Sequence, residues 1–360
     1  MDRSKWEYKP FEDCIEKSKK TKQLMTSDYQ PDGAYPIISQ EASLISGYTD
    51  APDYVNHFDR PVVIFGDHTR VLKYVDFDFA VGADGVKILI PHTNLDAKFL
   101  LSFLTWYKIP NLGYSRHYKL LKEISVPVPP IADQQRIVVE LDCLNEMIAV
   151  KQEQLKEFDK LAQSIFYDMF GDPNNNEKGF PLQTIDDVIK FEGGSQPARS
   201  FFEYEPTDDN IRLIQIRDYK TDAYITYIPK KMARRFCEED DIMIGRYGPP
   251  IFQILRGLKG AYNVALMKAV PKKGNKEFIR AFLKQDCLLH HLENFSRRVA
   301  GQDGIQMDEL KAYPFPYPPL SLQQQFADKI SAIEAQKELV KQSIAETQHL
   351  LDYTMDKYFG

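Results

Sequence analysis

Two stretches of this chain, residues 129–171 and 318–360, match each other without a gap when one is shifted by 189 positions. Each opens with two prolines, carries a glutamine pair (Gln134-Gln135 and Gln323-Gln324) and closes with Phe-Gly. Two unrelated amphipathic helices would rarely share both their end signals and their spacing. The match therefore indicates a tandem duplication, so we expect the fold to contain two equivalent elements.

Each stretch predicts one long helix. Apolar residues recur at alternating steps of four and three, which is the a/d pattern of a helix that packs along another helix. The seam residues are Ile137, Leu141, Leu144, Ile148, Leu155 and Phe158 in the first stretch and Phe326, Ile330, Ile333, Val340, Ile344 and Leu351 in the second. The Pro-Pro pair marks the start, and Gly171 is suited to a left-handed cap at the end. We expect the two helices to pair, with Lys151 and Lys337 as polar positions that set the register.

The segments before each helix predict two mixed domains. Strand patterns fall at 34–39, 60–65, 76–81 and 86–90 in the first and at 211–216, 223–228, 241–244 and 263–269 in the second, with helical patterns at 96–106 and 276–284. The expected bounds are 1–128 for the first domain, 129–173 for the first helix, 174–317 for the second domain and 318–360 for the second helix. The predicted fold class is α+β, a tandem repeat with pseudo-two-fold symmetry.

Charge is distributed unevenly along the chain. The formal net charge is −6. Counted by segment, the two long stretches contribute −4 and −2, so the domains are nearly neutral and can carry basic patches. The N-terminal residues lack an apolar core, no apolar run approaches the ~18 residues of a membrane helix, and Cys14, Cys143, Cys237 and Cys287 show no paired spacing. We expect a cytoplasmic protein with reduced thiols and no membrane partner.

The helix motifs P-P-(I/L)-x-x-Q-Q and F-G, with the order domain, helix, domain, helix, resemble the specificity (S) subunit of type I restriction–modification enzymes. The resemblance covers essentially the whole chain, although the domain interiors match only in layout. It implies two target-recognition domains that each read half of a bipartite site in double-stranded DNA. It also implies an intramolecular antiparallel coiled coil that fixes the spacer and binds two methyltransferase (M) subunits, and through them restriction (R) subunits. S-adenosylmethionine, ATP and Mg are then expected on those partners, with no cofactor on this chain.

Motifs for catalysis are weak. The sequence has neither a G-x-x-x-x-G-K-[ST] loop nor a G-x-G-x-x-G motif. Residues 248–251, Gly-Pro-Pro-Ile, lack the polar first and aromatic fourth residues of the motif found in amino-methyltransferases. The histidines do not show metal-ligand spacing, so we expect no metal site. These observations favour a non-catalytic subunit.

Basic and polar clusters suggest DNA contacts. Lys and Arg suit phosphates, while Arg and Gln can also read base edges. The candidates are Lys19, Lys20, Lys22, His68, Arg70, Arg116, His117 and Tyr118 in the first domain, and Arg212, Arg217, Lys230, Lys231, Arg234, Arg235, Arg246, Tyr247, Arg297, Arg298 and Gln302 in the second.

We therefore expect a sequence-specific DNA-recognition subunit. Two other classes stay open at this stage. A coiled-coil adaptor whose domains bind protein would show salt-insensitive DNA binding or none. A methyltransferase with its own cofactor site would bind S-adenosylmethionine as an isolated chain. The target bases and the spacer length do not follow from the sequence.

Overall fold

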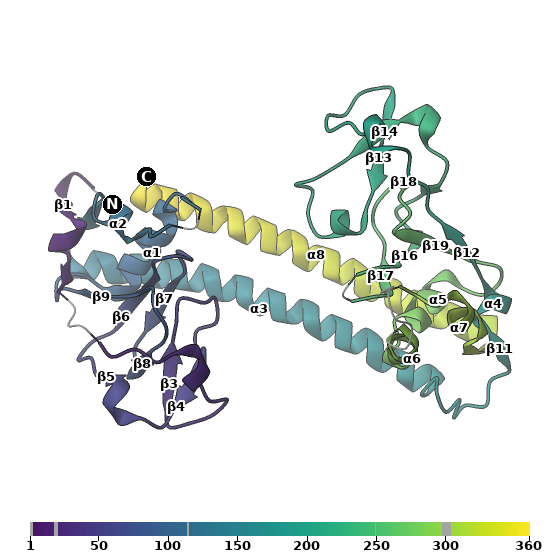
Figure 1. The fold of residues 1–360 in the computed structure, drawn as a ribbon, viewed down its shortest axis with the longest axis horizontal. Coiled ribbons are helices and arrows are strands. Elements are labelled where there is room, and N and C mark those ends of the chain that lie inside the picture. The colour runs from purple at the N-terminus through teal and green to yellow at the C-terminus, as the bar shows by residue number, and fades with distance from the viewer. Residues whose placement is uncertain (1–2, 18–20, 114, 249, 297–303) are drawn as a thin grey trace. The chain divides into compact units, whose positions relative to one another are not determined.

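The computed structural model describes residues 3–17, 21–113, 115–248, 250–296 and 304–360. The chain divides into two compact units. The first unit comprises residues 1–153 and 340–360, and the second comprises residues 154–339. Each unit holds one α+β domain and part of each long helix (Figure 1).

The two long helices are α3 (Ile131–Phe170) and α8 (Leu320–Phe359), each of 40 residues. Both begin directly after the Pro-Pro pair, because proline cannot sit in the interior of a helix. Gly171 has a φ of +72°, and its N–H donates to the carbonyl of Tyr167 at 2.8 Å. The left-handed glycine cap is confirmed.

The helices pair in antiparallel fashion, as predicted. In the first unit, the N-terminal half of α3 and the C-terminal half of α8 share one core, and in the second unit the opposite halves do. The buried seam residues are Ile137, Leu141, Leu144, Ile148, Phe326, Ile330, Ile333 and Leu351. Leu155, Phe158, Val340 and Ile344, which the heptad pattern also places in the seam, are only half-buried. The fully buried seam positions are those that also join the core of a domain.

The first domain contains two four-stranded sheets and a two-stranded ribbon. Its strands are β1 (Glu7–Pro10), β2 (Ile15–Glu16), β3 (Tyr35–Ile38), β4 (Gly47–Thr49), β5 (Val55–Asn56), β6 (Val62–Gly66), β7 (Leu72–Val75), β8 (Phe79–Val81), β9 (Val86–Pro91) and β10 (Ser125–Val128). The sheet orders are β2-β9-β6-β7 and β4-β3-β8-β5, and β1 pairs with β10. Only β3 and β8 pair in parallel among the described strand pairs of this domain.

The second domain repeats this topology strand for strand. Its strands are β11 (Leu182–Thr184), β12 (Ile189–Gly193), β13 (Asn210–Ile214), β14 (Tyr227–Pro229), β15 (Phe236–Cys237), β16 (Ile242–Gly245), β17 (Gln253–Leu255), β18 (Gly260–Tyr262), β19 (Leu266–Pro271) and β20 (Pro314–Pro316). The orders are β12-β19-β16-β17 and β14-β13-β18-β15, with β11 paired to β20 and a parallel β13–β18 pair. The duplication therefore includes the domains.

Three predicted strands differ from the structure. The stretch 263–269 was expected to be one strand, but residues 264–265 form a turn and β19 begins at Leu266. The stretch 76–81 was expected to be one strand, but β7 ends at Val75 and β8 begins at Phe79. The stretch 223–228 was also expected to be a strand, but β14 begins only at Tyr227, and residues 223–224 form a turn.

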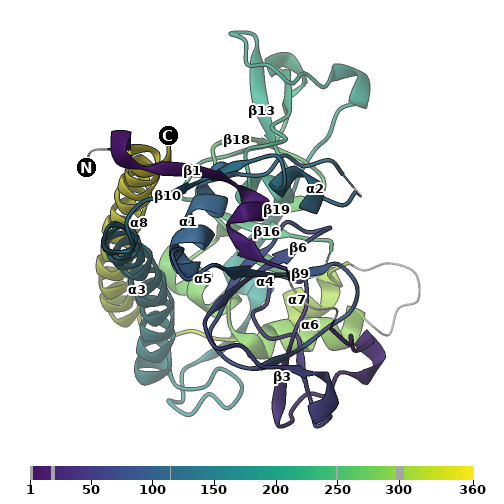
Figure 2. The same ribbon diagram turned by 90° about the vertical axis from the view of Figure 1, so that its left-hand side faces the viewer.

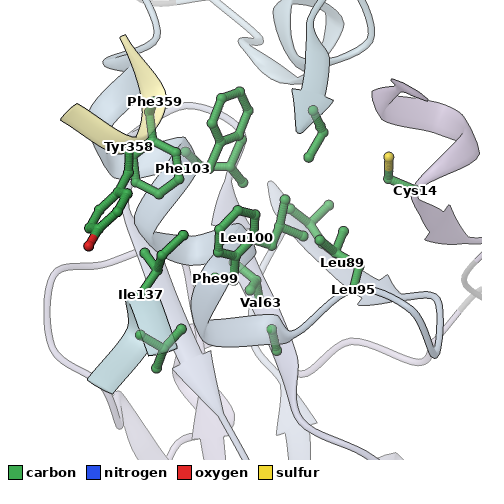
Figure 3. Close-up of a cluster of buried hydrophobic side chains, with 14 of the residues drawn as sticks. Cys14, Val63, Leu89, Leu95, Phe99, Leu100, Phe103, Ile137, Tyr358 and Phe359 are labelled. Atoms are coloured by element: carbon green, nitrogen blue, oxygen red, sulfur yellow. The ribbon is translucent and has the colours of Figure 1, made fainter. Parts of the chain in front are cut away.

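Shorter helices complete the two domains. They are α1 (Ala97–Tyr107), α2 (Tyr118–Leu121), α4 (Ile185–Val188), α5 (Lys276–Leu283), α6 (Asp286–Ser296) and α7 (Met307–Ala312). In the first unit α1 lies between α3 and the strands β6 and β9 (Figure 2). Its Phe99 and Phe103 meet Phe359 of α8, with ring centroids 5.5 and 5.7 Å apart (Figure 3). In the second unit Phe278 of α5 meets Phe170 of α3 at 4.6 Å, so the Phe of each Phe-Gly motif closes a domain core.

Candidate nucleic-acid interface

A cluster of loops in the first domain is organised around Asp67, at the end of β6. The Asp67 N–H donates to the Gly85 carbonyl at 2.7 Å, which joins the β6–β7 turn to the β8–β9 turn. The Asp67 carboxylate accepts the N–H of Tyr118 at 2.7 Å. These bonds bring the turns that carry His68, Arg70 and Arg116 into one loop cluster.

His117 lies inside this cluster and is fully buried, with 0% of its surface exposed. Its Nδ1–H donates to the Asp67 carbonyl at 2.9 Å, and its Nε2 accepts the N–H of Leu112 at 3.0 Å. Both ring nitrogens are therefore used within the protein. This corrects the expectation that His117 contacts DNA, because its ring holds the loop instead.

Tyr118 also belongs to the interior more than to the surface. It opens α2, and its ring packs against Phe11 and Phe65. Burial raises the pKa of its hydroxyl. The ammonium groups of Lys87 and Lys122 lie 5.5 and 5.7 Å from its ring centroid. We expect Tyr118 to support the neighbouring loop rather than to read DNA.

The remaining first-domain candidates lie at or near the surface. Arg116 is exposed and lies 3.4 Å from the carboxylate of Asp84. Arg70 adopts a left-handed backbone conformation (φ +63°), and its Nη1 donates to the Ile109 carbonyl at 3.1 Å. The ammonium of Lys22 lies 5.7 Å from the Tyr54 ring centroid. Lys19 and Lys20 lie outside the described residues.

Sequence reasoning missed the residue that joins these turns, Gln40. Its Oε1 accepts the N–H of His68 at 3.2 Å, and its Nε2 donates to the Asp84 carbonyl at 3.1 Å. Nearby, the buried Lys73 donates to the Ser39 carbonyl at 2.8 Å, and burial lowers the pKa of its ammonium. Gln40 and Lys73 both bind backbone groups of other loops, so the sequence pattern gave no signal for these contacts.

The second domain presents the same loops with different chemistry. Arg246 follows β16 as Asp67 follows β6, and its N–H donates to the Ala265 carbonyl at 2.9 Å. Its guanidinium lies 5.3 Å from the Tyr247 ring centroid, and Tyr247 forms a β-bridge to Gly304. The acidic centre of the first cluster is thus replaced by an arginine. Arg297, Arg298 and Gln302 lie outside the described residues.

Two further arginine candidates, Arg212 and Arg217, lie on or next to strand β13 in the sheet β14-β13-β18-β15. Arg212 lies within β13, with 19% of its side chain exposed, and pairs with Asp222 at 2.8 Å and Asp218 at 3.7 Å. Burial raises the pKa of the Asp218 carboxyl, and the two nearby arginines oppose that shift. Arg217, on the 3₁₀ turn η6 (Ile216–Tyr219), has 50% of its side chain exposed. Only Arg217 is well placed to reach a partner.

A basic segment follows β14. Lys230, Lys231, Arg234 and Arg235 are exposed, on the 3₁₀ turn η7 (Lys230–Met232) and the chain that leads to β15. Lys230 Nζ donates to the Asp208 carbonyl at 2.6 Å. In the part of the chain that the structure describes, the other three have no ion-pair partner. This segment therefore presents four exposed cationic side chains within six residues.

Neither a metal-ligand cluster nor a membrane-spanning helix occurs among the described residues. These residues contain no group of three or more His, Cys, Asp or Glu side chains that could hold a metal ion. None of their helices is both long and apolar enough to span a bilayer. The candidate loops carry cations, amides and aromatic rings.

The chain thus consists of two α+β domains of the same topology, each with a loop cluster at the same strand ends, and two paired long helices. The chain belongs to the family of the type I restriction modification DNA specificity domain, whose model matches residues 3–159 and 177–349. Both copies of the repeat are thus covered.

Two relatives of this chain are named type I specificity subunits. The chain is 24% identical over 222 residues to the specificity subunit of the type I restriction enzyme EcoR124I/EcoR124II of Escherichia coli, covering 57% of this chain and 53% of the relative. It therefore spans about half the length of that relative. It is 26% identical over 316 residues to a putative type I specificity subunit of Mycoplasma pneumoniae, covering 82% and 80%.

Solved structures show the same fold. The S subunit of a type I restriction-modification system from M. genitalium superposes with a TM-score of 0.60 at 15% identity, over 99% of this chain and 96% of that one. A chain from a study of complex assembly and conformational transition of the type I R-M system gives 0.54 at 15% identity, over 98% and 97%. The likeness extends over both domains and both long helices.

Proposed function

We propose that this chain is the sequence-specific DNA-recognition subunit of a type I restriction–modification complex. Each domain reads one half of a bipartite site in double-stranded DNA. The observation that carries this proposal is the family match over both halves of a chain whose two domains share one topology. A repeated fold with different loop chemistry is what two different half-sites require.

Two groups of residues in the second domain suit different roles in DNA binding. The basic segment at Lys230, Lys231, Arg234 and Arg235 suits phosphates, which fix position and carry no sequence information. Arg246 lies at the end of a buried strand beside Tyr247, and a guanidinium held in this way can donate two bonds to a guanine edge. We therefore assign orientation to the basic segment and base reading to Arg246.

The long helices are proposed to separate the domains and to bind two methyltransferase subunits, with restriction subunits joining through these. Their surfaces carry the excess of acidic residues, which suits protein partners better than phosphates. S-adenosylmethionine, ATP and Mg would be held by the partner subunits. The chain itself would be non-catalytic and would act in the cytoplasm.

The test is to map methylated bases in cells that express this chain together with its methyltransferase subunits. We expect one bipartite motif, lost when this chain is omitted. Arg246→Ala should relax the second half-site and leave the first unchanged, whereas Lys230→Ala with Lys231→Ala should reduce methylation at every site. Methylation that keeps its sequence pattern without this chain would refute the proposal.

A further inference from the structure

A hollow lies beside the sheet β14-β13-β18-β15 of the second domain, and the proposed function does not use it. It has a volume of about 500 Å³, and its walls include Tyr204, Arg217, Tyr224 and Tyr227. Asp222 also lines it, and the Asp222 carboxylate pairs with Arg212 at 2.8 Å. Tyr204 is 71% exposed and Tyr224 is 64% exposed. Large aromatic side chains that face water around one hollow indicate a binding site more often than chance exposure does.

Hydrogen bonds and a cation–ring contact fix the residues that line the hollow. The backbone of Glu203, next to Tyr204, exchanges two hydrogen bonds with Tyr227, at 2.9 and 2.8 Å. Arg217 Nη2 donates to the Tyr224 carbonyl at 3.2 Å, and its guanidinium lies 5.6 Å from the Tyr224 ring centroid. The hollow therefore exists before any ligand arrives.

The chemistry of these walls suits a flat ring with polar edges. Tyrosine rings and a guanidinium plane offer stacking faces that accept any nucleobase. Inside a duplex both faces of a base are covered by its neighbours, so such a hollow can take only a base that has left the stack. A proline-rich peptide would also suit exposed tyrosines.

Charge favours DNA over such a peptide. Tyr227 lines the hollow and belongs to β14, which leads directly into Lys230 and the basic segment. A strand of DNA whose phosphates lie on that segment would bring a neighbouring base to the hollow.

We propose that this hollow binds an unpaired DNA base, stacked on Tyr224 and contacted by Arg217, next to a backbone held by the basic segment. The inference rests on the proposed function, because it requires that the second domain bind DNA. It adds a single-strand subsite to a domain otherwise expected to read a duplex.

The experiment measures binding of the full chain to a fluorescent oligothymidylate and, separately, to a random duplex at the same salt concentration. Tyr224→Ala should weaken oligothymidylate binding about 5- to 150-fold, since stacking on one aromatic ring is worth roughly 1–3 kcal/mol. The same variant should leave duplex binding within twofold. Tyr224→Phe keeps the ring face and should bind as the native chain does.

Tyr353→Ala is the matched control, because Tyr353 is a similarly exposed tyrosine on α8. It should change neither affinity, and an unchanged melting temperature of all three variants shows that each is folded. Oligothymidylate carrying 5-iodouracil should photocrosslink to Tyr224 or Tyr204.

Other results distinguish failure of the base site from failure of the proposed function. Duplex binding without oligothymidylate binding, or equal losses on both DNAs in Tyr224→Ala, overturns the hollow as a base site and leaves the proposed function standing. Binding of a proline-rich peptide in place of oligothymidylate overturns it as well. Failure of the native chain to bind either DNA, with its methyltransferase subunits present, would count against the proposed function itself.

Discussion

The side-chain oxygen of Gln134 accepts the backbone N–H of Asp96 at 2.7 Å. Asp96 is the N-cap of α1, and Gln134 lies in the first turn of α3, so one hydrogen bond joins the starts of two helices. Gln323 and Asn275 repeat the bond at 2.8 Å in the second unit. Each glutamine also donates to the carbonyl of the first proline of its Pro-Pro pair. The first glutamine of each Gln-Gln motif therefore fixes a domain to its helix.

Gln134→Ala should destabilise the first unit. Gln134 is fully buried, and its removal leaves the Asp96 N–H and the Pro129 carbonyl without their partner. We expect a loss of roughly 1–3 kcal/mol in the free energy of unfolding, measured by urea denaturation. Gln135→Ala is the control, since Gln135 is exposed and should cost less than ~0.5 kcal/mol. Equal effects of the two changes would contradict this role.

Leu144 tests the helix seam. It is buried in the first core, where α3 and α8 meet α1. Leu144→Ala should cost about 2–5 kcal/mol, and Leu144→Asp should lower the melting temperature further. Val139→Ala, on the exposed side of α3, should leave it nearly unchanged. If Leu144→Asp melts like the native chain, the seam assignment is wrong.

Lys337 links stability to pH. Its Nζ lies 2.7 Å from Asp159 Oδ1 and 3.6 Å from Glu334 Oε1. Burial acts to raise the pKa of Glu334, but Lys337, Arg256 and Arg280 outweigh it, so the pKa is lowered. Ionised Glu334 therefore stabilises the fold above its unfolded-state pKa, and that contribution is lost as pH falls through the folded-state pKa.

Lys337→Met removes one of these cations. The variant should lose roughly 1–3 kcal/mol at pH 7 and show a shallower fall in stability between about pH 5 and pH 3. The measurement is the urea midpoint across that range, with the exposed Lys329→Met as control. Parallel pH curves for native chain and variant would show that Lys337 does not set the charge of Glu334.

Thiol labelling should follow burial. Burial raises the pKa of both Cys14 and Cys237 to about 11, whereas Cys143 is exposed on α3. At pH 8 the two buried thiols hold almost no thiolate, which is the reactive form. Iodoacetamide should therefore modify Cys143 first, and Cys14 and Cys237 only after urea is added. Peptide mass spectrometry reads out the order, and rapid native labelling of Cys14 would contradict the packing of the first core.

A fragment of residues 1–173 tests the repeat. It keeps the first domain and α3 but lacks Leu351, Tyr358 and Phe359, which belong to the first core. A second copy can offer a helix of the same length and nearly the same seam, so we expect a two-fold dimer, weaker than the native pairing. With methyltransferase present, that dimer should select an inverted repeat. A monomer by mass measurement, or an asymmetric selected site, would exclude the two-fold model.

The long helices were predictable because their signals are local. Heptad spacing, Pro-Pro entry and the Gly171 cap each act within a few residues. The ribbons β1–β10 and β11–β20 were missed for the opposite reason. Three of these four strands, β1, β10 and β20, contain prolines, which weaken strand patterns. Each strand also pairs with a partner more than a hundred residues away. Topology that depends on distant pairing leaves little trace in local periodicity.

The candidate site was less predictable still. A cluster of cations near Lys230 is visible in the sequence, and the structure shows it exposed. In contrast, nothing near His117 indicates that a backbone carbonyl 50 residues away occupies its ring. The carboxylates around Arg212 likewise come from a turn whose position depends on the fold. The sequence identifies the charged residues, but tertiary contacts decide whether their side chains can reach a binding partner.

The first unit is built from residues 1–153 and 340–360, and this division has a consequence for synthesis on the ribosome. Its core includes Phe359, which is translated some 200 residues after Glu153. At ~5–20 residues per second, the earlier part waits roughly 10–40 s for its missing side chains. During that interval α8 does not yet cover the apolar face of α3. A second nascent chain on the same messenger RNA exposes an equivalent apolar face. The domain that is made first is therefore the one that finishes folding last.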